Sequence, residues 1–554
     1  MMNESFRNAP FFLGDTELTW VNKTYSELTL EQKVGQLFNL IVRANSAEEL
    51  SLIDTIQPGA VTKFVGQDLD TEVKMMNQLR SHSVIPLLVS GDLEGGGMSF
   101  PFGAQVPNQL GLAGLKDESA VEYCTQVIAQ EAKLLGINWS FTPVVDINAK
   151  FRSAVVGTRS YGSDVDVIES MSLSNINTFQ KNGIAATAKH WPGEGFDDRD
   201  QHLVTTVNPL TMSEWEERYG RLYRSAIDSN VMSIMSAHIA LPEYVKTHND
   251  NPAEWWRPAS VSKLLNEQLL RGELGFNGLI VSDATVMAGL SSWTKRENVV
   301  AEIIENGCDM LLFCKDPVED YAYMLKAVRE GRVSETRLEQ SVMRILAMKA
   351  ALGLHEKQEE ISSSKFKDML ASDYADRIPE LNRRTVHLVK NRDNILPISL
   401  ERHQRVLVIS TGIRHVFSPI PASLSVATML KNEGFEVTEF QTGMALNVKE
   451  YDLLLYLNAD ESMLVKSHIY IDWMALHDGF GNAMYRPWVD IPTVMVSFGH
   501  PYLLYDAPKV PVYINAYSPL LEVQKAVVEG LLGRLSFNSN AAIDPFCGLE
   551  QLRY

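Results

Sequence analysis

The chain has 554 residues, of which 45% are hydrophobic and 21% are charged, and its formal net charge is -19. This length exceeds that of one typical domain, and the composition is that of a globular protein, so we expect neither a disordered nor a fibrous chain. The acidic balance would repel nucleic-acid phosphates and anionic membrane surfaces, so we expect no nucleic-acid or membrane partner.

The amino-terminal residues MMNESFRNAPFF lack the basic region and apolar run of a signal peptide. The sequence also lacks any window with the roughly 18 apolar residues of a spanning helix. We therefore expect a soluble, cytoplasmic protein. The four cysteines have no C-x-x-C spacing, which argues against a disulfide framework or a thiolate zinc site.

Short runs rich in Val, Ile and Leu recur between residues 35 and 314, each followed by a loop and a helix-like stretch. Thr29, with Glu31 and Gln32 behind it, predicts the start of the first of these helices. The runs are GQLFNLIV (35–42), GAVTKFV (59–65), IPLLVSGD (85–92), INWSFTPVVDI (137–147), IAATAKHWPG (184–193), VMSIMSAHI (231–239), GLIVSDA (278–284) and DMLLFC (309–314). Eight buried strands that alternate with helices predict a (β/α)8 TIM-type barrel over residues 1–355.

Polar residues stand at the carboxyl ends of five of these predicted strands. Any one of them could simply terminate a strand or cap a helix. In a barrel, however, the carboxyl ends of the strands meet at one face, which is where such enzymes carry their active sites. The sequence therefore predicts a site at that face. Its members would be Asp92, Asp146, Lys189 with His190, His238 and Asp283.

A second set of strands follows a polar stretch at 356–368 and a segment at 373–389 that we expect to be helical. These strands are RVLVIS (405–410), YDLLLYL (451–457), PTVMVSFG (492–499) and VPVYINAY (510–517). They predict a smaller α/β sandwich over 401–554, joined to the barrel by a linker and helical connection at 356–400. A G-x-G-x-x-G turn is missing from this half, so we expect no dinucleotide cofactor.

The stretch KHWPGEGFDDRDQH (189–202) gathers many ionisable side chains at the end of the fifth strand, and three interpretations are open. His190, Asp200 and His202 could supply a two-histidine, one-carboxylate metal site, although Lys189 would place an ammonium group beside the cation. Alternatively, the acids of this loop could merely face water. The third interpretation is a proton relay.

In the relay, the Asp200 carboxylate accepts a hydrogen bond from one ring nitrogen of His202. This bond would fix the tautomer and stabilise the imidazolium, which makes the histidine a usable general acid and base near neutral pH. Asp283, at the end of the seventh strand, could then attack an anomeric carbon and form a covalent glycosyl-enzyme. The alternative for Asp283 is a helix cap.

Five segments occur in the order of the signature segments of family 3 glycoside hydrolases, and the chain resembles the β-N-acetylglucosaminidase branch of that family. They are KHWPGEGFDDRDQH, GDLEGG, INWSFTPVVDI, GTRSYGSD and GFNGLIVSDA. The resemblance continues through HLVKNRDNILPI and PTVMVSFGHPYLL, as in two-domain members, and so covers nearly the whole chain.

The resemblance implies a retaining, exo-acting β-N-acetylglucosaminidase that works by double displacement on small glycosides or oligosaccharides, without a metal or other cofactor. Asp283 would be the nucleophile and His202 the acid/base, with Asp200 orienting the histidine. The sugar hydroxyls and ring would be held by Asp92, Arg159, Lys189 and His190.

Alternatives remain at the level of substrate and acceptor. Glu194 stands where this branch often has histidine, and Gly97–Phe100 reads GMSF where the branch has basic residues. A β-glucosidase is therefore the nearest rival. A histidine acid/base carries no negative charge when deprotonated, so phosphate could replace water and give a phosphorylase. A sugar-binding protein without catalysis is the third alternative, and a homodimer is also open.

Overall fold

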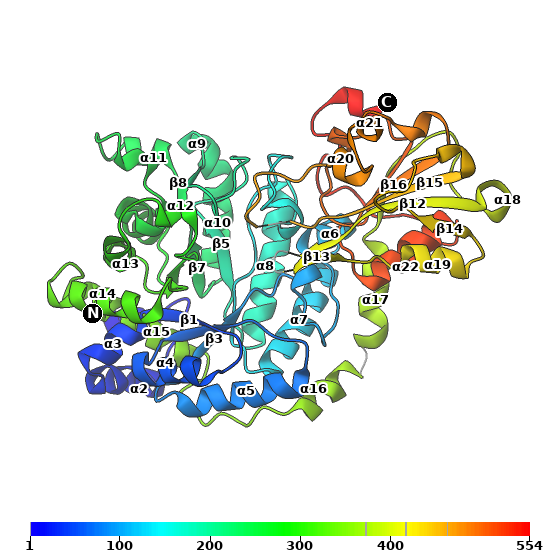
Figure 1. The fold of residues 1–554 in the computed structure, drawn as a ribbon. Coiled ribbons are helices and arrows are strands. Elements are labelled where there is room, and N and C mark those ends of the chain that lie inside the picture. Colours follow the sequence, from blue (N-terminus) through cyan, green and yellow to red (C-terminus); the bar gives the residue numbers. More distant parts are fainter. Residues whose placement is uncertain (1, 372–373, 416–417, 463) are drawn as a thin grey trace.

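The computed structural model describes residues 2–371, 374–415, 418–462 and 464–554. Figure 1 shows a ring of strands and helices at one end of the molecule and a second, open sheet at the other. Within the described residues, none of the helices combines the length and hydropathy of a membrane span.

The ring is built from parallel strands. One sheet has the order β10-β1-β2-β3-β4 and the other has the order β5-β7-β9. Two isolated parallel bridges, Trp139 to Ala185 and Val281 to Met310, connect these sheets at both edges. The result, within residues 2–371, is a closed, TIM-barrel-like ring of eight parallel strands, as predicted. The strands are β1 (Phe38–Val42), β2 (Ala60–Lys63), β3 (Leu88–Gly91), β4 (Trp139–Ser140), β5 (Thr187–Trp191), β7 (Ser233–Ser236), β9 (Leu279–Ser282) and β10 (Leu311–Leu312).

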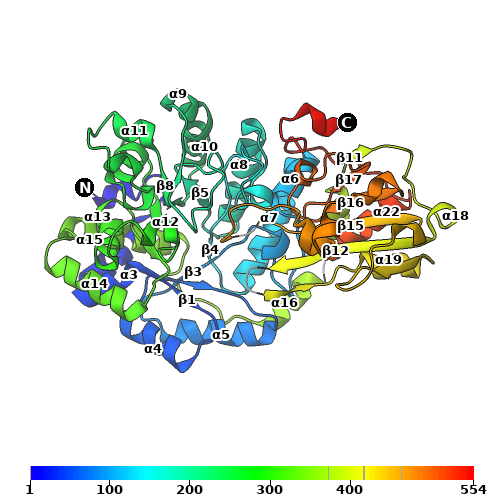
Figure 2. The same ribbon diagram turned by 45° about the horizontal axis from the view of Figure 1, so that its top comes forward.

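Helices surround this ring (Figure 2). They bury their apolar faces against it. The predicted start at Thr29 is confirmed, because its side chain and that of Gln32 form a reciprocal capping box. A short strand pair, β6 (Thr206–Val207) and β8 (Ile239–Ala240), lies beside the ring. The helices are α1 (Met2–Ser5), α2 (Asp15–Glu27), α3 (Leu30–Gln36), α4 (Ala47–Ile56), α5 (Leu69–His82), α6 (Gln109–Leu115), α7 (Glu118–Leu134), α8 (Val165–Lys181), α9 (Met212–Trp215), α10 (Arg221–Asp228), α11 (Pro242–Lys246), α12 (Ala288–Ser291), α13 (Arg296–Glu305), α14 (Pro317–Arg329) and α15 (Glu335–Ala351).

The second sheet has the order β11-β17-β16-β15-β12-β13, with β14 also paired to β12. Strands β12, β14, β15, β16 and β17 are parallel, whereas β11 and β13 are antiparallel to their neighbours. The elements of this part are α16 (Ser363–Leu370), α17 (Tyr374–Arg384), β11 (His387–Asn391), α18 (Leu400–His403), β12 (Arg405–His415), β13 (Ser418–Ala422), α19 (Val426–Asn432), β14 (Glu436–Glu439), β15 (Leu453–Ala459), α20 (Trp473–Leu476), α21 (Phe480–Ala483), β16 (Thr493–Ser497), β17 (Val512–Asn515) and α22 (Leu521–Leu531).

Alternate residues of the central strands face opposite sides of this sheet. Val406 and Val408 lie in one apolar core with α19 and α22, whereas Leu407 and Ile409 lie in another with α20. This period of two is what a strand covered on both faces requires. The prediction of a helix over 373–389 is wrong at its carboxyl end: α17 ends at Arg384, and His387 begins a strand that pairs with β17. Residues 372 and 373 lie outside the described residues.

The barrel and the second sheet share a small apolar cluster. Leu110 of α6 packs with Tyr502, Tyr517 and Ile543. The Asn108 side chain, which also caps α6, donates a hydrogen bond of 2.8 Å to the Tyr517 carbonyl. The second sheet is therefore held close to the carboxyl-end face of the barrel.

Candidate active site

The site residues implied by the family resemblance lie at or just after the carboxyl ends of barrel strands and on the loops that follow. They are Asp92, Arg159, Lys189, His190, Asp200, His202 and Asp283. Asp92 follows β3, Lys189 and His190 lie near the end of β5, and Asp283 follows β9. Glu194 interacts electrostatically with Arg159, Asp200 and Asp283, among other groups. The structure therefore brings these separate segments to one place.

Lys189 and Arg159 share a buried carboxylate. The Lys189 ammonium group lies 2.8 Å from Glu94 Oε1 and 2.7 Å from Asp92 Oδ1. The Arg159 guanidinium binds both oxygens of Glu94 at 2.9 Å. Burial alone would raise the pKa of Glu94, but Arg159 and Lys189 hold it far below the ordinary value. Asp92, with a side chain 36% exposed, is the most exposed member of this network.

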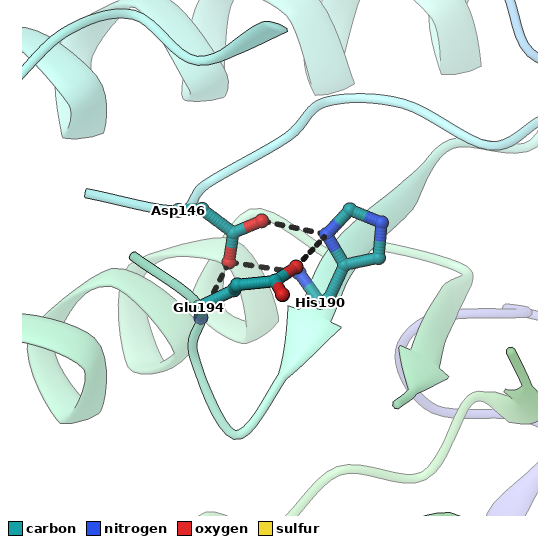
Figure 3. Close-up of side chains that lie close together, drawn as sticks. All are labelled: Asp146, His190 and Glu194. Carbon is teal, nitrogen blue, oxygen red and sulfur yellow. Dashed lines mark hydrogen bonds and ion pairs between the residues drawn. The ribbon is translucent and has the colours of Figure 1, made fainter. Parts of the chain in front are cut away.

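His190 is oriented by Asp146. Its Nδ1 lies 2.6 Å from Asp146 Oδ2, and the other oxygen of Asp146 accepts hydrogen bonds from the backbone N–H groups of His190 and Glu194. Figure 3 shows Asp146 and Glu194 on the Nδ1 side of the ring, with the far ring nitrogen pointing away from both. The far nitrogen is therefore the one available to a substrate.

Asp146, His190 and Glu194 could also hold a metal ion, since their ligand atoms lie within 4.8 Å of one another. Two features disfavour this. Nδ1 of His190 is already bonded to Asp146. Burial, together with the charges of Asp146 and Asp200, raises the pKa of Glu194 well above its ordinary value, which opposes the loss of the proton that a metal ligand must give up. The donor set therefore fits a hydrogen-bonded cluster better than a cation.

Asp200 and His202 form the pair that the sequence spacing predicted. The Asp200 Oδ1 atom lies 2.6 Å from His202 Nδ1 and accepts a second bond, of 2.7 Å, from the His202 backbone N–H. Asp200 is buried, whereas the side chain of His202 is 20% exposed. Such a pair can present the second ring nitrogen to a leaving group as a proton donor.

Asp283 is fixed on its strand and is ionised. Its backbone N–H donates to the Ser236 carbonyl at 2.7 Å, and its Oδ1 accepts a bond from the Ala284 N–H. Burial raises its pKa, but the charges of His190, His238 and His202 outweigh burial and hold the pKa below the ordinary value. A buried, ionised carboxylate in this setting can act as a nucleophile.

His238 is a structural residue. It is completely buried, and its ring nitrogens bond to Ser260 Oγ at 2.8 Å and the Ala284 carbonyl at 3.0 Å. Burial lowers its pKa. Its position at a strand end resembled that of the other polar residues, but both of its nitrogens are occupied.

Sequence reasoning missed the part played by Glu94. The signal was its place two residues after Asp92, since alternate residues at a strand end point to the same side. It also missed a contact from the second sheet: the backbone N–H of Val465 lies 2.7 Å from Asp200 Oδ2. A backbone group 265 residues away in sequence leaves no signal that a local pattern can carry.

The chain is similar to known proteins over most of its length. Residues 29–348 match the family model described as "Glycosyl hydrolase family 3 N terminal domain". A "Beta-N-acetylglucosaminidase/beta-glucosidase" of Cellulomonas fimi is 35% identical over 558 residues, which cover 98% of each chain.

Solved structures are similar over the whole chain as well. A "Beta-glucoside phosphorylase BglX bound to 2FGlc" is 31% identical with a TM-score of 0.92, and the likeness covers 99% of this chain and all of the other. A family 3 β-N-acetylglucosaminidase from Paenibacillus sp. str. FPU-7 has a TM-score of 0.80 at 24% identity, over 94% of this chain and 99% of the other. At that identity the second likeness concerns the fold alone.

Proposed function

Because the chain belongs to glycosyl hydrolase family 3, we propose that it is a retaining, exo-acting β-N-acetylglucosaminidase that releases terminal sugars from small β-glycosides. The observation that carries this proposal is the buried Asp200 bonded to His202, in electrostatic contact with an ionised Asp283. One carboxylate and one acid/base group are what double displacement requires.

In the first step, an Asp283 oxygen attacks the anomeric carbon as the bond to the leaving oxygen breaks. The His202 imidazolium gives its proton to that oxygen, and the leaving group departs as an alcohol. In the second step, neutral His202 takes a proton from water, whose oxygen attacks the anomeric carbon and releases Asp283. Two inversions give net retention, and Asp200 stabilises the imidazolium each time.

The sugar would be held by Asp92, Arg159, Lys189 and His190. Lys189 and Asp92 offer a donor and an acceptor side by side, which suits a pair of neighbouring hydroxyl groups. The relative from Cellulomonas fimi is named for both N-acetylglucosaminides and glucosides, so we include β-glucosides as second substrates.

Phosphorolysis is a second candidate, and a specific observation favours it. The BglX structure, 31% identical over the whole chain, is named a β-glucoside phosphorylase. A neutral histidine would repel an incoming phosphate less than a carboxylate does. The product would then be a sugar phosphate in place of the free sugar.

The test compares rates on p-nitrophenyl β-N-acetylglucosaminide and p-nitrophenyl β-glucoside, with and without phosphate. Asp283→Ala should abolish activity on both. His202→Ala should lose about 10²–10⁴-fold on glycosides whose leaving group needs a proton, and much less on p-nitrophenyl glycosides.

Full activity of Asp283→Ala would contradict the proposed nucleophile. A sugar phosphate formed in proportion to added phosphate would move the enzyme to the phosphorylases. If wild type and Asp283→Ala both bind sugar but neither turns it over, the non-catalytic, sugar-binding alternative would be favoured.

A further inference from the structure

A connection from the second sheet crosses to the mouth of the barrel. It leaves β15 and appears in Figure 1 as the orange loop that reaches from the sheet toward β5. We call residues 460–462 and 464–466 the crossing segment. Its described residues bond to three different loops of the barrel.

The first two contacts anchor the segment. Glu461 Oε1 accepts a bond of 3.0 Å from Asn108 Nδ2. Ser462 Oγ accepts a bond of 2.7 Å from the Thr158 N–H, and the Ser462 N–H donates to Thr158 Oγ1 at 3.2 Å. Gly157 permits this approach, because a Cβ there would overlap Ser462 Oγ.

The third contact reaches the proposed acid/base pair. The Val465 N–H donates to Asp200 Oδ2 at 2.7 Å, while Oδ1 of the same carboxylate is occupied by His202. Both oxygens of Asp200 are thereby held, so the carboxylate has no free rotation about its last bond. Because His202 Nδ1 is bonded to this carboxylate, the orientation of the imidazole ring is fixed as well.

The backbone at Val465 is strained in a way that its side chain does not explain. Its φ is +63°, a left-handed conformation that β-branched residues rarely adopt. The side chain is 62% exposed, so packing does not hold it there. In this conformation the N–H points toward Asp200. Strained backbone conformations are often found where function requires a group to be fixed in place.

We propose that the backbone N–H of Val465 is a positioning group for acid/base catalysis, so that the second sheet completes the barrel's active site. This inference rests on the proposed function of Asp200 and His202. The Val465 N–H itself touches neither the substrate nor a reacting atom. It sets the orientation of the proton donor.

The test replaces the Val465 amide by an ester in the full-length chain, by incorporating α-hydroxyisovaleric acid at position 465. This change removes the N–H and keeps the side chain. Val465→Gly is the matched control, because glycine keeps the N–H and accepts positive φ without strain. Rates are measured on aryl β-N-acetylglucosaminides with good and poor leaving groups, and the thermal midpoint is measured for each protein.

We expect the ester to lose about 10–100-fold on the poor leaving group and less than about threefold on the good one, since only the former needs the proton. Val465→Gly keeps the N–H, so it should show no such split between the two leaving groups. A purely structural role would lower the two rates together, or would lower the thermal midpoint without this split.

A second readout does not need turnover. The His202 Nδ1 proton, shared with Asp200, should give a downfield proton resonance that His202→Ala removes and the ester variant shifts or broadens. Inactivity of the wild-type enzyme on every glycoside would refute the proposed function, and this resonance would still test the positioning role.

Three outcomes would overturn the inference: equal losses on both leaving groups, an unchanged resonance in the ester variant, or equal losses in the ester and glycine variants. If the ester variant does not fold, Ser462→Ala takes its place, because it removes the acceptor of the Thr158 N–H and loosens the segment. The same split between leaving groups is expected, and its absence would count against the proposal.

Discussion

Glu94 is the residue on which the ion-pair network of Asp92, Arg159 and Lys189 depends. Its carboxylate lies between two cations that are almost completely buried, Arg159 and Lys189. Each cation would otherwise raise the free energy of the folded state, because desolvation of an unpaired charge is costly. Glu94 is hydrogen-bonded to both cations, whereas Asp92 is hydrogen-bonded to Lys189 alone.

Replacing Glu94 by glutamine should destabilise the protein, because a neutral amide cannot balance two buried cations. We expect the free energy of unfolding to fall by about 3–5 kcal/mol, measured by urea titration at pH 7. Asp92→Asn is the matched control: its side chain is 36% exposed, so its stability should change little while kcat/KM falls. Equal stability of Glu94→Gln and wild type would show that the network is not needed for folding.

At the scale of elements, the crossing segment is anchored by the acidic side chain of Glu461. Burial raises the pKa of Glu461 to about 7, against the opposing hydrogen bonds from Asn108, Gly97 and Ser518. Because this pKa is above the ordinary carboxyl value, the folded state binds more protons than the unfolded state between about pH 4.5 and pH 7. The contribution of Glu461 to stability therefore falls as the pH rises through that window.

Glu461→Gln should remove this pH dependence while keeping a group that can bond to Asn108. We expect a gain of about 1–3 kcal/mol in the free energy of unfolding at pH 8, and a smaller gain at pH 5. Denaturant titrations at both pH values measure the difference. Glu401→Gln, at an exposed position, is the control and should be neutral at both. A gain in the free energy of unfolding that does not change with pH would contradict a raised pKa of Glu461.

At the scale of the whole molecule, a lysine is completely buried where the helices α15 and α3 pack together. Lys349, near the end of α15, is completely buried and donates one bond of 2.6 Å to Gln36 Oε1. Burial lowers its pKa to about 7. The folded state then binds fewer protons than the unfolded state between about pH 7 and pH 10.5, so this part of the stability rises with pH.

Lys349→Met should therefore stabilise the protein most at pH 7 and below. We expect a gain of about 2–4 kcal/mol at pH 7 that shrinks toward pH 10, measured by denaturant titration across this range. Lys449→Met, at an exposed position, is the control for the change of side chain. A gain in the free energy of unfolding that is the same at every pH, or that is absent at pH 7, would show that burial does not lower the pKa of Lys349.

Much of the fold could be predicted because its signals are local. Short apolar runs predict the eight barrel strands, and the chain direction alone predicts that Asp92, Lys189 and Asp283 lie at carboxyl ends of strands. The strands β11, β13 and β14 were missed. They lie at the edges of the sheet. The residues of β11 and β14 are mostly exposed or half-buried, so their apolar pattern is weak.

The sequence by itself determined the strand order along the chain, the Asp200 and His202 spacing and the family, because each depends on residues close together or on ordered motifs. Only the tertiary structure decided that Glu94 joins Arg159 to Lys189, that burial and nearby carboxylates raise the pKa of Glu194, and that Val465 bonds to Asp200. These features depend on burial and on contacts between segments up to 265 residues apart. Such contacts arise from packing of the whole chain, which no local pattern of residues specifies.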